Sequence, residues 1–218
     1  MKTTLLFLCL IILNANCLNA QDVKIGKQVW MSKNLDVSTF RNGDTIFHAK
    51  NSVEWEKAAE NKLPAWRYAY DNDPNKEVYG RLYNWYAFND PRGLAPRGYH
   101  LPSNEEWAKL IKFLRKGGKI GLKLKSKNGY KCRQTSPNGD RSYYGNGSNS
   151  SGFDGLPGGM LDCNGRLNEY GNTGYWWHSE KDSLFSWSVR LTCNNNNQDL
   201  MFQDVWKCYG ASVRCIKD

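Results

Sequence analysis

The clearest pattern of apolar and polar positions lies between residues 103 and 118. Four apolar residues recur at the i, i+3, i+4 and i+7 spacing that places side chains on one helix face: Trp107, Leu110, Ile111 and Leu114. Ser103 and Glu106 have the spacing of a capping box, in which each side chain accepts a hydrogen bond from a free backbone amide. Gly117-Gly118 is expected to end the helix. The pattern therefore predicts a helix that packs on the core and whose acidic residues serve as caps.

Strand patterns dominate the two ends of the chain. Residues 185–193 alternate, with one set of side chains on each face of a strand: Trp187, Val189 and Leu191 against Ser186, Ser188 and Arg190. A short hairpin is expected around Gly26-Lys27, and Asn42-Gly43 is expected to form a turn. A second helix is predicted over residues 51–61, capped by Ser52 and unable to continue through Pro64. Two helices in the first half with antiparallel strands at both ends predict an α+β fold.

The segment between Lys125 and Gly152 is rich in Lys, Asn, Ser and Gly. It is too polar for a core strand, and long irregular segments of compact domains are either functional or disordered. Residues 153–180 then place six glycines among aromatic residues, which favours tight turns and short strands. Much of the chain is therefore expected to be loop.

The first twenty residues have the composition of an export signal. Lys2 precedes an apolar run from Leu5 to Leu13, and cleavage is expected after Ala20. The run is too short to span a bilayer, and no later segment qualifies. An alternative is a lipoprotein anchored through Cys17, although the residues before Cys17 are a poor lead-in. Residues 1–20 are thus a predicted signal peptide, and residues 21–218 a single exported domain.

Net charge narrows the possible partners. The chain carries a formal charge of +9, and its basic residues gather between Lys109 and Lys131. Such a run is most often a solvated helix face. It can also bind polyanions, and for an exported protein anionic glycans or the cell envelope are nearer partners than nucleic acid.

Five cysteines follow the signal segment: Cys132, Cys163, Cys193, Cys208 and Cys215. Outside the cytoplasm they should pair and leave one thiol over. The spacing alone does not choose among the possible pairings.

Catalytic motifs are missing from the sequence. The histidines His48, His100 and His178 stand far apart and belong to no zinc-binding pattern. The chain has no nucleophile elbow, phosphate loop or dinucleotide fingerprint. Glu105 and Glu106 cannot act as paired carboxylates, because neighbours on a helix point apart. We expect no catalysis and no obligatory cofactor.

One loop of the sequence is a candidate calcium site. The stretch DNDPNKE places oxygen-bearing side chains at alternate positions: Asp71, Asp73, Asn75 and Glu77. Lys76 stands where an EF-hand loop has glycine, and Leu82 stands where it has its bidentate glutamate. An ordinary Asp/Asn/Pro turn is therefore favoured over a calcium site.

Glycan binding needs exposed aromatic faces beside amide or carboxylate groups. The stretches YWWHSE and CNNNNQD supply both, which makes six residues candidate ligands: Trp176, Trp177, His178, Asn195, Asn197 and Asp199. On a strand Trp176 and Trp177 point to opposite faces, so the glycan hypothesis carries the expectation that one of them lines a surface groove. Adjacent tryptophans of compact β-rich domains are more often covered by loops, and this alternative is favoured.

Five ordered stretches resemble the Fibrobacter succinogenes major paralogous domain family, a group of exported bacterial domains of undefined activity. They are GKQVWMSKNL, DNDPNKEVYGRLYNWYA, APRGYHLPSNEEWAKLIKFL, NSSGFDGLPGG and GYWWHSE. The resemblance covers nearly all of the chain after the signal. The family often has a cysteine pair flanking the loop at residues 71–77, and this chain has none there, so a disulfide that would tether the loop is missing.

A more distant resemblance concerns shape. The stretch GYHLPSNEEWAKL is similar to a helix start in formylglycine-generating-enzyme-like domains, and SVRCIKD is similar to their last strand. Those domains have a C-type-lectin-like fold. The stretch FQDVWKC also resembles a closing block of C-type lectins, and this likeness implies a Cys193–Cys208 disulfide. Neither sugar-binding triplet of those lectins, Glu-Pro-Asn or Gln-Pro-Asp, occurs here.

Together these observations predict a non-catalytic, exported or surface recognition domain with a C-type-lectin-like fold, in which short helices pack on antiparallel strands beside a large irregular loop region. Its expected partner is a glycan or an envelope protein. The alternatives are a formylglycine-generating-enzyme-like metal-dependent oxidase and a purely structural surface component. A shared fold does not decide among them.

Overall fold

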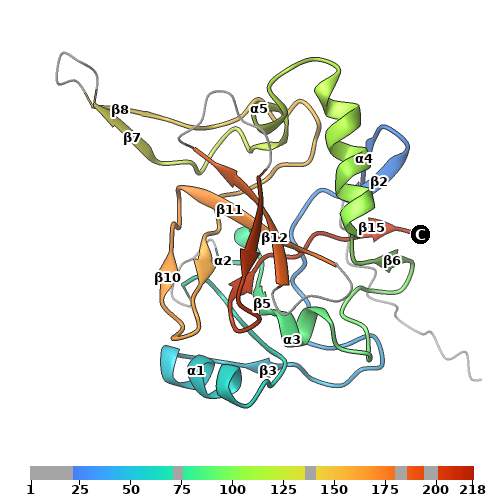
Figure 1. Cartoon of the computed structure of the whole chain (residues 1–218), viewed down its shortest axis with the longest axis vertical. Helices are drawn as coiled ribbons and strands as arrows, with labels where there is room; N and C mark the ends of the chain where they lie inside the picture. Colours follow the sequence, from blue (N-terminus) through green and yellow to red (C-terminus); the bar gives the residue numbers. More distant parts are fainter. Residues whose placement is uncertain (1–21, 71–75, 136–140, 180–185, 194–200) are drawn as a thin grey trace, which may run out of the picture.

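The computed structural model describes residues 22–70, 76–135, 141–179, 186–193 and 201–218. The predicted signal segment and Cys17 lie outside this part. Short helices pack against strands that are antiparallel except for one pair, so the fold is α+β as predicted (Figure 1). Among the described residues, none of the helices is both long and apolar enough to cross a membrane.

The strands form four sheets. The four-stranded sheet has, in spatial order, β1 (Asp22–Ile25), β2 (Gln28–Met31), β15 (Ile216–Lys217) and β6 (Tyr99–His100). The six-stranded sheet has β10 (Leu167–Asn168), β9 (Met160–Leu161), β14 (Gly210–Ala211), β5 (Leu82–Asn84), β4 (Ala65–Arg67) and β3 (Phe47–His48). The three-stranded sheet has β11 (Thr173–His178), β12 (Ser186–Thr192) and β13 (Met201–Val205), and the hairpin has β7 (Cys132–Thr135) and β8 (Arg141–Tyr144).

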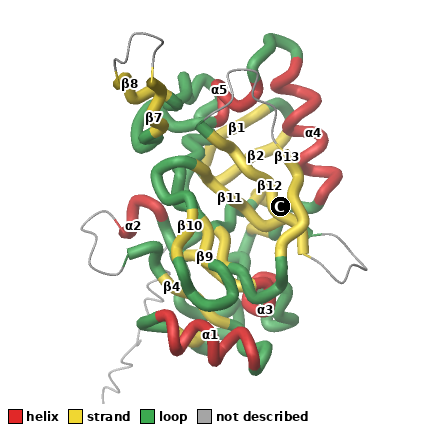
Figure 2. Tube along the Cα trace, turned by 60° about the vertical axis from the view of Figure 1, so that its left-hand side comes forward, coloured by secondary structure: helices red, strands yellow, loops and turns green. Residues whose placement is uncertain are grey.

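The described helices are short: α1 (Ser52–Glu60), α2 (Lys76–Tyr79), α3 (Trp85–Phe88), α4 (Asn104–Arg115) and α5 (Ile120–Leu124). The two longest of these, α1 and α4, lie towards opposite ends of the molecule (Figure 2). The three-stranded sheet runs between them.

Helix α4 has the predicted capping box. Ser103 Oγ accepts a hydrogen bond from the Glu106 amide, and the Glu106 carboxylate accepts one from the Ser103 amide. Of the predicted face, Trp107, Leu110 and Leu114 are buried and Ile111 is partly buried. The periodic spacing therefore located this helix and its buried face correctly.

Helix α1 also forms where predicted, but its cap is Asn51 instead of Ser52. The Asn51 side chain accepts a hydrogen bond from the Glu54 amide, while Ser52 is the first helical residue and donates to the Gly165 carbonyl. The prediction of Ser52 was wrong by one position because Asn and Ser are both strong caps and only the backbone conformation distinguishes them.

The hairpin around Gly26-Lys27 is confirmed, since Ile25 pairs with Gln28 across a two-residue turn. The polar segment from Lys125 to Gly152 contains structure that its composition did not indicate. Strands β7 and β8 pair within it, and Lys125 itself is buried. Polar composition was a poor guide here because part of the segment packs against the core.

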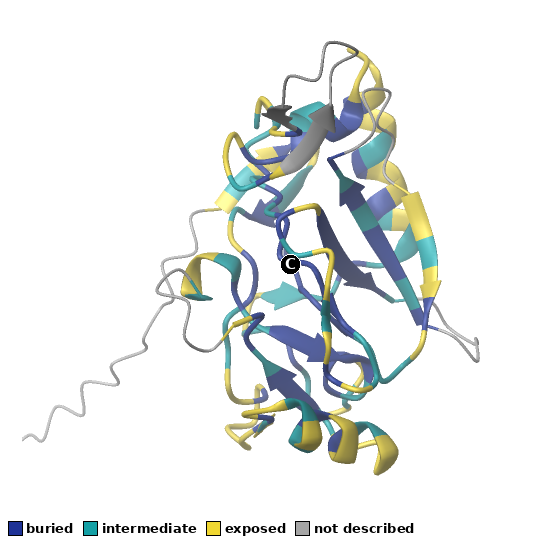
Figure 3. Ribbon diagram, turned by 90° about the vertical axis from the view of Figure 1, so that its left-hand side faces the viewer, coloured by how far each residue is buried: buried dark blue, intermediate teal, exposed yellow. Residues whose placement is uncertain are grey.

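The core is divided into two large apolar clusters by strand β11. Trp176 packs in the cluster beneath α4 and α5, with Trp107 and Phe153, whereas Trp177 packs in the cluster around Trp85. The central strands are accordingly buried on both faces, and exposed residues gather on α1, α4 and β13 (Figure 3).

Candidate ligand-binding surface

The two tryptophans that the sequence singled out point to opposite faces of β11, as alternation requires. Both are fully buried, at 0% exposure each. The Trp176 Nε1 donates to the Asn34 side chain and the Trp177 Nε1 donates to the Tyr83 carbonyl. The expectation that one of them lines a surface groove was wrong, because both faces of β11 are covered by core.

His178 occupies the end of the same strand and is 1% exposed. Its ring packs edge to face against Phe202, with 5.3 Å between ring centroids, and lies 6.3 Å from the Trp187 ring. Within the described part of the chain, neither ring nitrogen has a partner with hydrogen-bonding geometry. Burial lowers the pKa of His178 to about 4, so the ring is neutral at physiological pH.

Most of the other predicted ligands lie outside the described residues: Asp71, Asp73, Asn75, Asn195, Asn197 and Asp199. Glu77 is described and lies exposed on α2. No cluster of three or more His, Cys, Asp or Glu side chains that could hold a metal ion occurs in the described ranges. The calcium hypothesis therefore stays a prediction.

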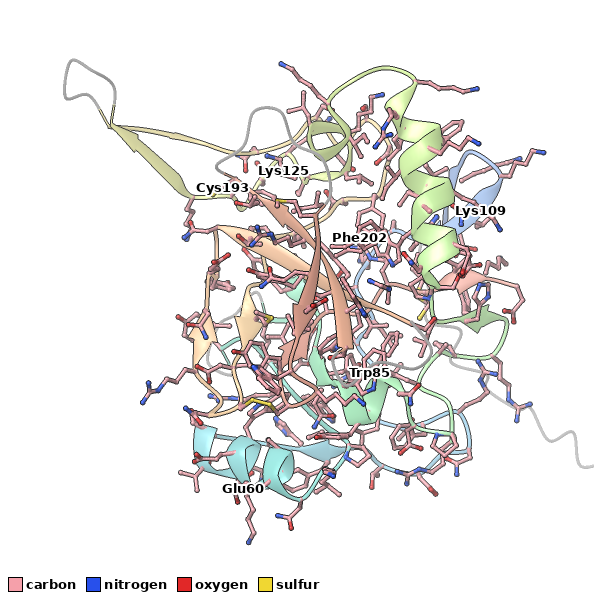
Figure 4. The ribbon with its side chains drawn as sticks, viewed as in Figure 1. Glu60, Trp85, Lys109, Lys125, Cys193 and Phe202 are labelled. Carbon is pink, nitrogen blue, oxygen red and sulfur yellow. A yellow bond between two sulfur atoms is a disulfide. The ribbon has the colours of Figure 1, made fainter. Side chains whose placement is uncertain are left out.

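An exposed aromatic row lies on β13 and directly after it. We use this term for Phe202, Asp204 and Trp206, which stand at alternate positions. Phe202 is 38% exposed and Trp206 is 58% exposed, and Asp204 between them is also exposed. Strand β13 ends the three-stranded sheet, so no further strand of that sheet covers the row. Figure 4 places Phe202 on the side of the sheet that faces α4.

The strand register connects this row with His178. Asp204 pairs with Trp187 on β12, and Trp187 in turn pairs with His178 on β11. Residues that pair directly across strands point to the same face. His178 is therefore the buried end of a line of side chains whose exposed end is Asp204.

The backbone that carries Trp206 is held on both sides. Cys208 forms a disulfide with Cys163, the Trp85 amide donates to the Lys207 carbonyl, and the Tyr209 amide donates to the Trp206 carbonyl. The implied Cys193–Cys208 disulfide is therefore wrong. Cys193 is bonded in a different disulfide, and Cys215 is the free, buried thiol among the described cysteines.

A concave surface lies between α1 and the edge strand β3. It is a groove of about 650 Å³ lined by Phe47, His48, Lys50, Glu54, Lys57, Ala58, Asn61 and Leu63. The His48 ring stacks on Trp66 at 3.9 Å between centroids. Phe47 is 40% exposed, almost the same fraction as Phe202. Exposed aromatic residues thus occur beside α1 as well as in the aromatic row.

The comparison with protein families is decisive for classification. The family described as the Fibrobacter succinogenes major domain matches residues 23–217. The chain belongs to this family. Its sequence is not significantly similar to any curated protein or solved structure. The Fibrobacter succinogenes major domain match covers nearly all of the chain that follows the predicted signal segment.

Phe202 and Trp206 were not among the residues that sequence reasoning selected. The available signal was the alternate spacing of Phe202, Asp204 and Trp206 in FQDVWKC. That stretch attracted attention only through its resemblance to a lectin block. Alternation in a strand that ends a sheet, followed by a cysteine, would have identified the same row.

Proposed function

We propose that this Fibrobacter succinogenes major domain is a non-catalytic, exported recognition domain that binds glycan through the aromatic row on β13. The observation that carries the proposal is the exposure of Phe202 on the edge strand β13 and of Trp206 directly after it, with a carboxylate between them. Exposed aromatic residues that are held in place mark binding sites more often than scattered apolar residues do.

The chemistry of the row suits a sugar. Pyranose rings present C–H faces that pack on aromatic rings, and hydroxyl groups that donate to carboxylates. Phe202 and Trp206 offer the faces and Asp204 offers the acceptor. The Cys163–Cys208 disulfide beside Trp206 reduces the entropy that is lost when a ligand orders a side chain.

Export and the C-type-lectin-like architecture are parts of the same proposal. A disulfide is typical of proteins outside the cytoplasm. Short helices packed on mainly antiparallel strands support the lectin-like architecture. The oxidase alternative rests on a resemblance to enzymes that use a pair of free cysteines. Among the described cysteines, Cys208 is bonded to Cys163 and Cys215 is the free thiol, so Cys208 and Cys215 do not form such a pair.

The test is a glycan array on the purified, oxidised protein, run with calcium and again with a chelator. For each glycan that binds, Phe202→Ala and Trp206→Ala should weaken binding about tenfold, which corresponds to about 1.4 kcal/mol per aromatic contact. Phe47→Ala is the matched control, because it removes an equally exposed ring from the groove beside α1.

Three outcomes would count against this assignment. An equal loss in Phe47→Ala would move the site to the groove beside α1. A chelator effect would revive the calcium hypothesis at Asp71, Asp73, Asn75 and Glu77. A blank array at high protein concentration would exclude glycan as the ligand, and capture of an envelope protein that depends on Phe202 would then support strand addition at β13.

A further inference from the structure

The outward face of α4 carries a stripe of lysines. Lys109, Lys112 and Lys116 follow one another at the i, i+3 and i+7 spacing, and all three are exposed. Lys109 projects away from the molecule in Figure 4. The opposite face holds the buried Trp107 and Leu114. The lysines are therefore held outward by the same periodicity that buries the core residues.

Neighbouring cations and one apolar ring enlarge this stripe into a platform. The tip of the β1–β2 hairpin lies against α4, since Gln28 Nε2 donates to the Glu106 carbonyl and Gly26 packs on the Phe113 ring. The hairpin tip brings Lys27 to the same side. Three further exposed residues complete the platform: Phe113, Arg115 and Lys119. Phe113 is 50% exposed.

The positive charge of the platform is not neutralised by neighbouring carboxylates. Among the described side chains, the cations of the platform form no ion pair; the ion pairs found involve Arg81, Arg92, His100 and Lys217. Of the two carboxylates on α4, Glu106 is bound by Ser103 and His100, and Glu105 stands in the first turn. After its first turn, the outward face of α4 therefore carries cations and no carboxylate.

We propose that this platform docks on an anionic membrane surface. Basic residues around an exposed aromatic ring are the composition of surface-bound helices, in which phosphate headgroups attract the cations and the ring enters the interface. The platform combines cations with an exposed apolar ring. A leaflet offers phosphate headgroups above an apolar interior and so matches both features, whereas a polyanionic chain matches the cations alone. This docking surface is separate from the aromatic row on β13, so either proposal can fail without the other.

The charge and the apolar ring have separate expected effects. Each lysine near an anionic leaflet strengthens binding about fivefold, so loss of the three-lysine stripe should weaken partitioning about 100-fold. A half-exposed phenylalanine that becomes buried in the interface should contribute about fivefold more. Salt should weaken the first effect and leave the second.

The experiment measures partitioning of the whole protein onto phosphatidylcholine vesicles with and without phosphatidylglycerol. The variants are Lys109→Gln, Lys112→Gln and Lys116→Gln combined, and Lys50→Gln, Lys57→Gln and Lys62→Gln combined. The second set is the matched control, because it removes the same charge from exposed lysines on and beside α1. A third variant, Phe113→Ala, tests the ring.

The expected result is binding to the anionic vesicles only, weakened about 100-fold in the α4 set and by much less in the control set. Phe113→Ala should weaken binding at high salt about fivefold. Equal weakening in both lysine sets would reduce the effect to net charge and overturn the proposal. Absence of binding to anionic vesicles would overturn it as well, as would a stripe-dependent affinity for dextran sulfate without vesicle binding. Thermal unfolding of each variant excludes misfolding as the cause.

Discussion

The side-chain oxygen of Asn34 accepts a hydrogen bond from the Trp176 Nε1 at 2.8 Å, inside the core. The same oxygen accepts from two nitrogens of Arg214, and the Asn34 amide donates to the Tyr79 carbonyl and to Ser212 Oγ. Arg214 is fully buried and lies over the Phe153 ring. One asparagine oxygen therefore accepts hydrogen bonds from both a buried guanidinium and a buried indole. The Met31 and Phe153 carbonyls accept the remaining hydrogen bonds of Arg214.

Replacement of Asn34 by Ala should destabilise the protein strongly. It leaves the Arg214 charge and the Trp176 N–H short of a partner in the core, which costs about 3 kcal/mol of unfolding free energy. Ser212→Ala removes only the Ser212 hydroxyl from this network and should cost less than about 1 kcal/mol. Urea unfolding of both variants measures the difference. Similar losses of unfolding free energy in the two variants would show that Asn34 does not stabilise the buried Arg214 charge.

The Cys163–Cys208 disulfide should contribute substantially to stability. The bonded cysteines are 45 residues apart, and closing a loop of that length limits the unfolded chain by about 4 kcal/mol in the chain-entropy model. Cys163→Ala with Cys208→Ala should lower the unfolding free energy by up to that amount, as measured by urea denaturation.

A non-reducing digest with mass spectrometry checks the connectivity directly. A peptide linking Cys193 to Cys208 would contradict the pairing described above. Burial raises the pKa of the Cys215 thiol to about 12, so this thiol should react with Ellman's reagent only after unfolding. Rapid labelling of the native protein at Cys215 would show that the segment directly before β15 opens in the folded state.

The features that the sequence predicted correctly depend on periodic spacing within one segment of the chain. The i, i+3, i+4 and i+7 spacing located α4, and the capping box set its first turn, because both depend on residues within one segment. Alternation correctly placed Trp176 and Trp177 on opposite faces of β11. It could not predict that both faces are buried, since that depends on α4 and α5 on one side and on α3 on the other.

Long-range contacts account for the wrong predictions. The pairing of Cys208 with Cys163 depends on the turn after β13 meeting the loop after β9, which no spacing encodes. The burial of Lys125 in a polar stretch involves a distant strand, since its ammonium donates to the Thr192 carbonyl on β12. The aromatic row could have been predicted from the sequence, because its alternate spacing is local. Its exposure depends on β13 being the last strand of its sheet, which the local sequence does not show.

Lys125 is predicted to destabilise the native state at neutral pH. Its side chain is 1% exposed, with the ammonium 5.2 Å from the Tyr130 ring centre and 3.4 Å from the Thr192 carbonyl oxygen. Burial lowers the pKa of Lys125 to about 8. Between this value and the ordinary pKa of about 10.4, the unfolded chain binds the extra proton, so stability from this group rises with pH in that range.

The variant Lys125→Met should therefore be at least as stable as the wild type at pH 7, since it keeps the apolar stem and removes the buried charge. Its advantage should shrink as the pH is raised from about 8 towards 9.5. Thermal unfolding of the two proteins at each pH gives the difference. A variant that is clearly less stable at pH 7 would mean that the ammonium makes stronger contacts than the Thr192 carbonyl and the Tyr130 ring provide.

His100 connects the start of α4 with the end of the chain and should give stability a second pH dependence. Its Nε2 lies 2.7 Å from the Glu106 carboxylate and its Nδ1 lies 2.8 Å from the Asp218 carboxylate. Burial alone would lower the pKa of His100, but hydrogen bonds to both carboxylates outweigh it and raise the pKa. Burial would likewise raise the pKa of Glu106, and hydrogen bonds from Ser103 and His100 instead lower it.

The signs of the two shifts define a window. The contribution of His100 is complete below its unfolded pKa of about 6.5 and is lost as the pH rises through the folded value, while that of Glu106 is complete above about 4.3 and is lost as the pH falls. His100→Gln should therefore be most destabilising between about pH 4.5 and 6.5, by less than about 1 kcal/mol because the pair is partly exposed to solvent. A double-mutant cycle with Glu106→Gln separates this coupling from the capping role of Glu106. A coupling energy that does not change from pH 5 to pH 9 would show that the contact does not depend on the imidazolium charge.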